Sequence, residues 1–125
     1  MVVNGYGGLD ELTTTGPNRV SHFKDGQVRS YEINPQDYGF RGANISELLG
    51  DDAPTNAAIL RGILSGEIKD AKRDVVLLNA AAALIAADLV SNIADGIARA
   101  TEIIDSGAGL KKLDELVSTS QKLAA

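Results

Sequence analysis

The chain has 125 residues, 44% of them hydrophobic and 23% charged, which suffices for one compact domain and leaves no room for two ordinary ones. Its 17 acidic residues outnumber its 12 basic ones, and the formal charge of −5 disfavours general electrostatic binding to nucleic acid or to an anionic membrane. The absence of cysteine excludes disulfides, thiolate nucleophiles and cysteine-ligated metal centres, and a single histidine, His22, cannot form a multi-histidine site. Since no basic region followed by an apolar run opens the sequence, we expect no cleaved secretory signal and a cytoplasmic location.

The first 40 residues, which contain all the aromatic side chains, predict strands and turns. Residues 19–24 and 27–33 flank Asp25-Gly26, a pair that adopts positive φ easily and therefore predicts a two-residue turn between two strands. We expect Pro35 to end the second strand. Neither face of this hairpin is cleanly apolar, so the pattern leaves open which face packs against the rest of the chain.

The second part of the chain predicts helices. Residues 36–53 indicate a connecting loop with one helical turn near Ile45 to Leu49, and a helix is expected from about residue 54 to 65. A further helix should follow Asn92 and end at Gly107, and the last one carries a stripe of leucines at helical spacing.

The most apolar segment runs from Val75 to Ala87 and is interrupted only by Asn79. A helix formed by this run is apolar on every side, so we expect a central and almost fully buried helix. Its 13 residues fall short of the roughly 20 that span a bilayer. We expect Asn79 to be a buried, hydrogen-bonded structural amide, and we give His22, in mid-strand, little weight as a catalyst.

Residues 5–11 are the densest candidate for chemistry, because glycines follow an apolar start and precede Asp10-Glu11. Glycine-rich loops after strands often bind phosphate, but this one lacks the Lys-Ser/Thr of a Walker loop and the third glycine of a dinucleotide fingerprint. Two carboxylates repel a phosphate unless a hard cation such as Mg²⁺ lies between them. The pattern therefore leaves two interpretations, a metal-bridged phosphate site or simply an acidic turn or the acidic first turn of a helix. Residues 13–17 indicate a strand end and a turn, and a second interpretation is that the hydroxyls of residues 13–15 help to orient the shell of such an ion.

Several segments match one known family in the same order along the chain. They include Gly8-Leu9-Asp10-Glu11, and the others lie at residues 2–5, 15–20, 24–26, 56–60, 74–81 and 98–107. Together they resemble the C-terminal part of anthranilate phosphoribosyltransferase, and the resemblance covers nearly the whole chain but only about the last third of a family member. Where members commonly carry histidine this chain has Asn4, and near a usual glycine it has Asp88. We expect the difference at Asp88 to affect only packing.

The resemblance implies an α/β fold, the C-terminal portion of the large α/β domain of the nucleoside phosphorylase/phosphoribosyltransferase type, with a β-hairpin followed by about four helices. Residues 1–125 are then a single partial domain, with strand, loop and hairpin in 1–40 and the helical part in 54–125. The family transfers phosphoribosyl from phosphoribosyl pyrophosphate to anthranilate in tryptophan biosynthesis. Its adjacent Asp-Glu pair binds Mg²⁺ and falls on Asp10 and Glu11.

The family's Gly-Thr-Gly-Gly-Asp phosphate loop, its anthranilate-contacting residues and the N-terminal helical domain that forms its homodimer correspond to nothing in these residues. We therefore expect a fragment, or one piece of a split enzyme, that is inactive alone and exposes apolar surface and unpaired strand edges. Such a fragment either self-associates or needs the missing N-terminal portion. The alternatives are a non-enzymatic remnant or binding module, and a fragment of a pyrimidine nucleoside phosphorylase.

Overall fold

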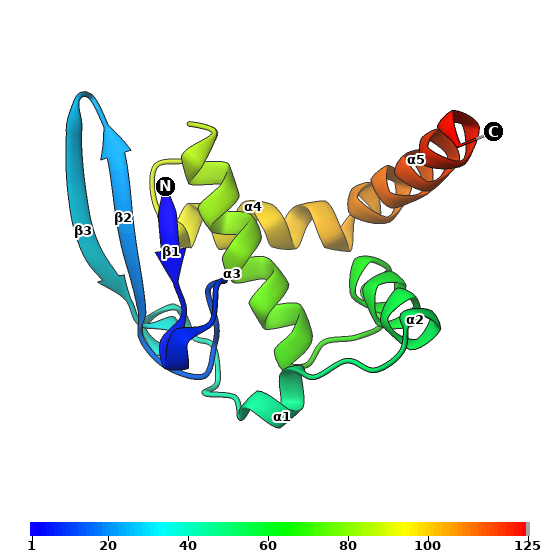
Figure 1. Cartoon of the computed structure of the whole chain (residues 1–125), viewed down its shortest axis with the longest axis horizontal. Helices are drawn as coiled ribbons and strands as arrows, with labels where there is room; N and C mark the ends of the chain where they lie inside the picture. Colours follow the sequence, from blue (N-terminus) through cyan, green and yellow to red (C-terminus); the bar gives the residue numbers. More distant parts are fainter. Residues whose placement is uncertain (125) are drawn as a thin grey trace.

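The computed structural model describes residues 1–124 and places a small sheet on one side of the molecule with helices beside it (Figure 1). The sheet is antiparallel with strand order β1-β2-β3, formed by β1 (Val2–Asn4), β2 (Asn18–Lys24) and β3 (Gln27–Ile33). The helices are α1 (Ile45–Leu48), α2 (Ala53–Leu64), α3 (Ala71–Ala86), α4 (Ile93–Asp105) and α5 (Ala108–Leu123). The expected α/β class, a hairpin followed by helices, is confirmed, and α1 stands where a single helical turn was expected.

The hairpin turn forms as its sequence predicts. Asp25 and Gly26 have φ values of 51° and 76°, the left-handed region that a two-residue turn requires. The structure also settles which face packs inward. Val20 and Ile33 are 1% and 2% exposed on the inner face, whereas Phe23, on the opposite face, is 66% exposed.

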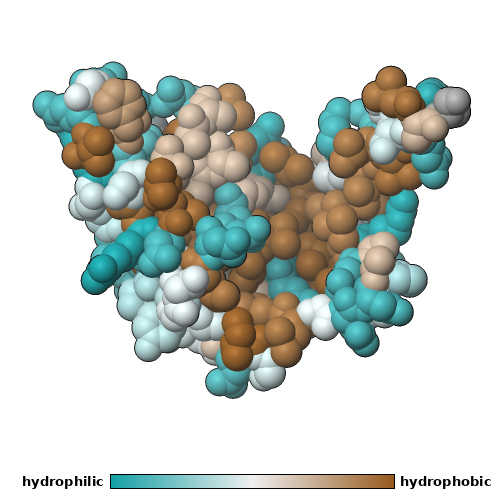
Figure 2. All heavy atoms as spheres, viewed as in Figure 1, coloured by the Kyte–Doolittle hydropathy of each residue, from teal (hydrophilic) through white to brown (hydrophobic). Residues whose placement is uncertain are grey.

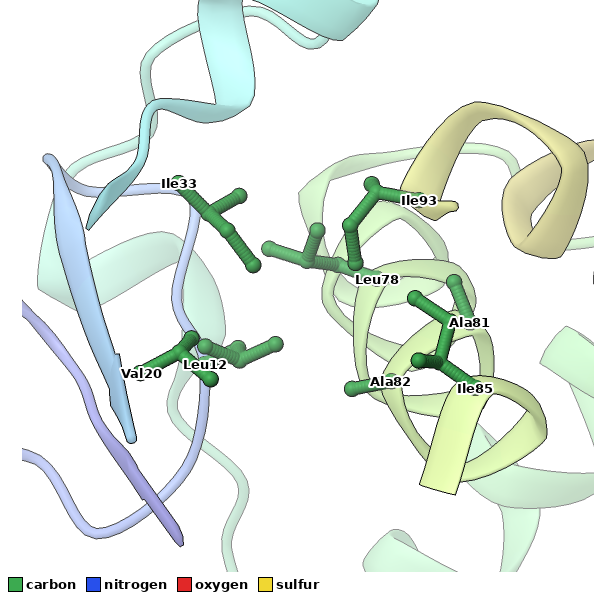
Figure 3. Close-up of a cluster of buried hydrophobic side chains, with 8 residues drawn as sticks. All are labelled: Leu12, Val20, Ile33, Leu78, Ala81, Ala82, Ile85 and Ile93. Carbon is green, nitrogen blue, oxygen red and sulfur yellow. The ribbon is translucent and has the colours of Figure 1, made fainter. Parts of the chain in front are cut away.

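The main core lies between this inner face and α3. Leu12, Val20 and Ile33 point toward Leu78 and its neighbours on α3, and Ile93 of α4 closes the cluster (Figure 3). α4 crosses α3 closely at Gly96, since a Cβ there would lie 2.8 Å from the Ala81 Cα. Glycine at this point is required because the two backbones leave no space for a side chain.

The expectation that the central apolar helix is almost fully buried is wrong. α3 buries Leu78 and the other residues that face the sheet, but Ala83 is exposed and Val76, Ala80 and Leu84 are only partly covered. The helix also begins earlier than expected, because the side chain of Asp70 accepts a hydrogen bond from the Lys72 backbone N–H and caps it. Burial on every side needs packing partners that residues 1–124 do not supply.

Among residues 1–124, no helix combines the length and the apolar character needed to cross a membrane.

A half-buried carboxylate, Asp74, lies in the first turn of α3. Burial raises its pKa above the ordinary value of 3.8, and the Arg73 guanidinium opposes that effect only in part. The folded chain holds the Asp74 proton more tightly than the unfolded chain does. The protonated carboxyl therefore contributes stability that is complete below the ordinary pKa and is lost as the pH rises through the folded-state pKa.

We expect Asp74→Asn to remove that loss, so the free energy of unfolding of the variant rises relative to that of the wild type between acid and neutral pH. Urea unfolding across this range checks it, with the exposed Asp51→Asn as the control. A difference between Asp74→Asn and wild type that does not change with pH would contradict the assignment.

Candidate functional site

The glycine-rich segment forms a closed loop after β1. The Gly5 backbone N–H donates to the Leu9 carbonyl at 2.7 Å, and Gly7 and Gly8 take positive φ at the tip of the loop. A Cβ on Gly5 would lie 2.2 Å from the Glu11 carbonyl oxygen, so only glycine permits this approach. The glycines therefore shape the backbone that leads into Asp10 and Glu11.

Asp10 and Glu11 lie in a bend outside any helix, which excludes the interpretation of an acidic first helical turn. Both side chains are exposed, whereas the next residue, Leu12, is 1% exposed. In the part of the chain that the structure describes, no hydrogen bond or ion pair joins either carboxylate to another group. The pair is thus available to a ligand.

Two asparagines fix the backbone that follows this pair. Asn79 on α3 accepts a hydrogen bond from the Leu12 N–H at 3.0 Å and donates to the Leu12 carbonyl at 2.7 Å and the Val75 carbonyl at 3.0 Å. Asn18 on β2 accepts from the Thr13 N–H at 2.8 Å and donates to the Thr13 carbonyl at 2.9 Å. Paired hydrogen bonds therefore join Leu12 to α3 and the next residue, Thr13, to β2. The hydrogen-bonded amide expected at Asn79 is confirmed, although its side chain is partly rather than fully buried.

The donor set suits a hard divalent cation that keeps part of its own shell. Mg²⁺ prefers carboxylate oxygens and is commonly held by one or two carboxylates together with water and substrate phosphates. Two free carboxylates on an anchored backbone match that pattern. Nowhere in residues 1–124 do three or more His, Asp or Glu side chains gather as a complete metal site. A cation at Asp10 and Glu11 would therefore take its remaining ligands from outside this cluster.

The hydroxyls of Thr13 and Thr14 do not line the surface beside these carboxylates. Thr13 and Thr14 are each 1% exposed. The Thr13 hydroxyl lies 3.0 Å from the Thr15 hydroxyl and accepts from the Thr15 N–H at 3.2 Å. The idea that Thr13 and Thr14 orient the shell of an ion is wrong in this fold, because they are used in, or buried beneath, the turn.

The buried Thr14 hydroxyl has no hydrogen-bond partner among residues 1–124. Replacing it with the isosteric valine removes an unsatisfied polar atom, so we expect Thr14→Val to raise the free energy of unfolding by about 1 kcal/mol. Thr13→Val is the matched control, and it should lower stability because it breaks the contact with Thr15. Urea unfolding of the two variants checks the prediction, which is wrong if Thr14→Val destabilises the chain as much as Thr13→Val.

A second polar region lies under the hairpin, and the sequence analysis did not find it. A cavity of about 760 Å³ opens between the inner face of the hairpin and the α3–α4 connection, and its lining includes His22, Lys24, Arg29, Tyr31 and Asp88. Lys24 Nζ lies 2.5 Å from Asp88 Oδ1, and this bond holds the pKa of Asp88 below its usual range. Neither Asp10 nor Glu11 contributes to it. Its two sides come from segments far apart in the sequence, and Lys24 and Asp88 are 64 residues apart, so no local pattern could reveal it.

Asp88 and Asn4 are the positions where the chain departs from the family pattern. Asp88 has φ of 57°, a left-handed conformation that glycine adopts without strain. The expectation that a departure here affects only packing is therefore incomplete, because the backbone at Asp88 takes a conformation that favours glycine. Asn4 is exposed and lies opposite Arg19 on the neighbouring strand.

Comparisons with known proteins agree with this geometry. Residues 1–110 match the family described as "Glycosyl transferase family, a/b domain". The anthranilate phosphoribosyltransferase of Roseiflexus castenholzii is 49% identical over 121 residues, which cover 96% of this chain and 36% of that protein. The enzyme of the same name from a Thermoanaerobacter species is 48% identical over 98% of this chain and 36% of its own length.

Solved structures of the same enzyme share the fold. The enzyme from Thermus thermophilus aligns with a TM-score of 0.83 and 35% identity, covering 94% of this chain and 34% of that one. The Saccharomyces cerevisiae enzyme, in complex with phosphoribosyl pyrophosphate and Mg, aligns with a TM-score of 0.85 and 26% identity over 96% of this chain and 34% of that one. The resemblance seen in the sequence is confirmed, and the chain spans about a third of the length of the relatives it matches. By the match over residues 1–110, this chain belongs to the family described as "Glycosyl transferase family, a/b domain".

Proposed function

We propose that this chain is the C-terminal third of an anthranilate phosphoribosyltransferase and that Asp10 and Glu11 bind the Mg²⁺ that meets phosphoribosyl pyrophosphate. The observation that carries the proposal is the free, exposed pair of carboxylates on a backbone fixed by Asn79 and Asn18. A solved relative with the same fold holds phosphoribosyl pyrophosphate and Mg, the combination this pair suits.

Charge explains why the cation is needed. The chain has a formal charge of −5, and Asp10 and Glu11 repel a pyrophosphate that approaches them directly. When bound, Mg²⁺ neutralises charge on the departing pyrophosphate as the ribosyl bond breaks. The residues of this chain would hold the cation: the carboxylates would supply oxygens, and the paired hydrogen bonds to Leu12 and Thr13 fix the backbone that follows them.

The proposal makes residues 1–125 one partial domain that is inactive alone. The glycine-rich phosphate loop and the anthranilate-contacting residues belong to the part of the enzyme that this chain does not match, and so does the region that forms the homodimer. The partly uncovered apolar side of α3 supports this division. Use of phosphoribosyl pyrophosphate and anthranilate in tryptophan biosynthesis also supports a cytoplasmic location.

Loss of anthranilate fluorescence tests the function. The partner fragment is the part of the Roseiflexus castenholzii relative that lies outside its matched 36%. With phosphoribosyl pyrophosphate and Mg²⁺ present, we expect no loss with the chain alone and steady loss once the partner fragment is co-expressed with it. If the chain alone consumes anthranilate, the claim that it needs the partner fragment for activity is wrong. A complex that forms but consumes no anthranilate would overturn the assigned reaction and favour a non-enzymatic remnant.

A further inference from the structure

The cavity under the hairpin is lined by neither Asp10 nor Glu11, so the proposed reaction assigns it no role. The turn of the hairpin and the C-terminal end of α3 lie at the same end of the molecule, and the cavity opens between them (Figure 1). Its volume of about 760 Å³ lies within the range of about 300 to 1,000 Å³ that is typical of small-molecule sites. The hairpin cavity, as we call it, is therefore large enough for a small organic ligand.

The inner face of the hairpin changes character along its length. Val20 and Ile33 belong to the main core. Nearer the turn, His22 lies directly opposite Arg29 on the neighbouring strand. Residues two apart on a strand share a face, so His22, Arg29 and Tyr31 lie on the same face as Val20. These three polar side chains form one wall of the hairpin cavity.

The base of the hairpin cavity is apolar. Ile33 of β3, Ile85 of α3 and Ile93 of α4 line it, and they are only 2%, 8% and 5% exposed. A polar wall above an apolar base suits a molecule with an apolar body and a polar head group.

The acidic side chains of the lining already have cations close by. Asp88 is paired with Lys24, and Glu32 lies 3.7 Å from the Arg19 guanidinium. The hydrogen bond to Asp88 raises the pKa of Lys24, and Asp25 in the turn adds a smaller electrostatic effect of the same sign, so Asp25 also lies in the field of this ammonium. None of the three acids is thus left as an isolated charge for a cationic ligand.

Arg29 supplies the free cation of the lining. Its side chain is exposed and forms no ion pair or hydrogen bond with any of residues 1–124. A guanidinium presents N–H donors in one plane that match the two oxygens of a carboxylate. Burial raises the pKa of Tyr31 above the ordinary 10.0, and Tyr38 adds to the rise, so the Tyr31 phenol remains a donor at neutral pH. Because three acids lie nearby, a singly charged carboxylate fits better than a doubly charged phosphate.

We propose that the hairpin cavity binds a small carboxylic acid with an aromatic or branched apolar body, its carboxylate on Arg29 and its body against Ile85 and Ile93. The ligand contacts both the hairpin and the α3–α4 connection, so its binding stabilises the folded chain.

The test measures binding to the 125-residue chain by fluorine NMR with three probes of similar shape, namely para-fluorobenzoate, the neutral para-fluorobenzamide and the cationic para-fluorobenzylamine. The variants are Arg29→Gln, which removes the charge, and Arg29→Lys, which keeps the charge but not the planar donors. Arg99→Gln is the matched control, because Arg99 is exposed on α4 and does not line the cavity. Helix content of each variant checks the fold.

We expect the wild type to bind para-fluorobenzoate at least about tenfold more tightly than para-fluorobenzamide. Arg99→Gln should bind like the wild type, Arg29→Gln at least about tenfold more weakly, and Arg29→Lys between the two. The proposal is wrong if the wild type does not bind para-fluorobenzoate, if it binds the benzoate and the benzamide equally, or if Arg29→Gln and Arg99→Gln bind alike. Tighter binding of para-fluorobenzylamine would show that the cavity selects a cation, which also overturns the proposal. Asp10, Glu11 and the partner fragment take no part in this test, so its outcome is independent of the proposed function.

Discussion

In the co-expressed complex, the double variant Asp10→Asn/Glu11→Gln is expected to lower kcat/KM for phosphoribosyl pyrophosphate by at least about a hundredfold at limiting Mg²⁺. Amide oxygens carry no net charge, so they bind Mg²⁺ weakly and leave the pyrophosphate charge without compensation. Both side chains are exposed and form no hydrogen bond or ion pair with another described residue, so the substitutions should not disturb folding. Anthranilate fluorescence across a Mg²⁺ titration measures the effect.

The matched control is Asp51→Asn/Glu67→Gln, which removes the same two charges from exposed positions elsewhere. It should retain wild-type kcat/KM, and this separates a specific site from a general effect of net charge. Co-purification yields of both double variants should equal the wild type. The assignment is contradicted if the two double variants lose activity equally, or if Asp10→Asn/Glu11→Gln keeps wild-type activity at every Mg²⁺ concentration.

Asn79→Leu is expected to lower the free energy of unfolding by about 2 to 3 kcal/mol. The substitution keeps the size of the side chain, but it removes both hydrogen bonds to Leu12, whose backbone groups lie in a residue that is 1% exposed. A buried N–H and a buried carbonyl are then left without partners, and the helical Val75 carbonyl loses an extra donor. Urea unfolding of the chain measures the change.

The chain offers an almost identical arrangement at its surface as a control. Asn56 accepts from the Asp51 N–H at 2.9 Å and donates to the Asp51 carbonyl at 2.8 Å, and both residues are exposed. Water replaces these bonds after substitution, so Asn56→Leu should cost less than about 1 kcal/mol. Equal losses in the two variants would mean that burial of the Leu12 backbone adds nothing and that Asn79 does not anchor the loop.

The sequence predicted the turns and helix caps that depend on one or two adjacent residues. Asp25-Gly26 carries its own conformational preference, and the turn forms between the strands that flank it. Asn92 was expected to cap α4, and its side chain accepts from the Asp95 N–H. The start of α3 was missed because Asp70 stands in a charged connector, where its capping role cannot be distinguished from that of any exposed acid.

For features that depend on distant residues, the sequence predicted the type of interaction but not the partner. The apolar run around Asn79 indicated a hydrogen-bonded amide, but not that its partner is Leu12, 67 residues away. Full burial of α3 was wrong for a related reason, since a sequence gives the hydrophobicity of a helix and not the identity of what covers it. On the side of α3 that faces away from the sheet, an apolar recess lined by Val76, Ala80 and Ala83 is left partly uncovered, and Figure 2 shows hydrophobic atoms there.

The sequence identified the residues of the candidate site, but the structure corrected which neighbouring side chains lie beside them. Asp10 and Glu11 were singled out by charge next to a glycine-rich loop, and the structure places them exposed on a fixed bend. The hydroxyls of Thr13 and Thr14 were expected beside them but are buried, because Asn18 draws this stretch against the sheet. Sequence proximity alone does not separate a side chain that faces a ligand from one that faces the core.

Mn²⁺ binding tests the role of Asp10 and Glu11 most directly, since Mn²⁺ prefers the same oxygen ligands as Mg²⁺ and its free form is counted by electron paramagnetic resonance. The titration uses the chain co-purified with its partner fragment in the presence of phosphoribosyl pyrophosphate, beside the Asp10→Asn/Glu11→Gln and Asp51→Asn/Glu67→Gln variants. We predict that the wild type and the Asp51→Asn/Glu67→Gln control bind Mn²⁺ at least about tenfold more tightly than Asp10→Asn/Glu11→Gln. Equal affinity in all three proteins would contradict the role assigned to these two carboxylates.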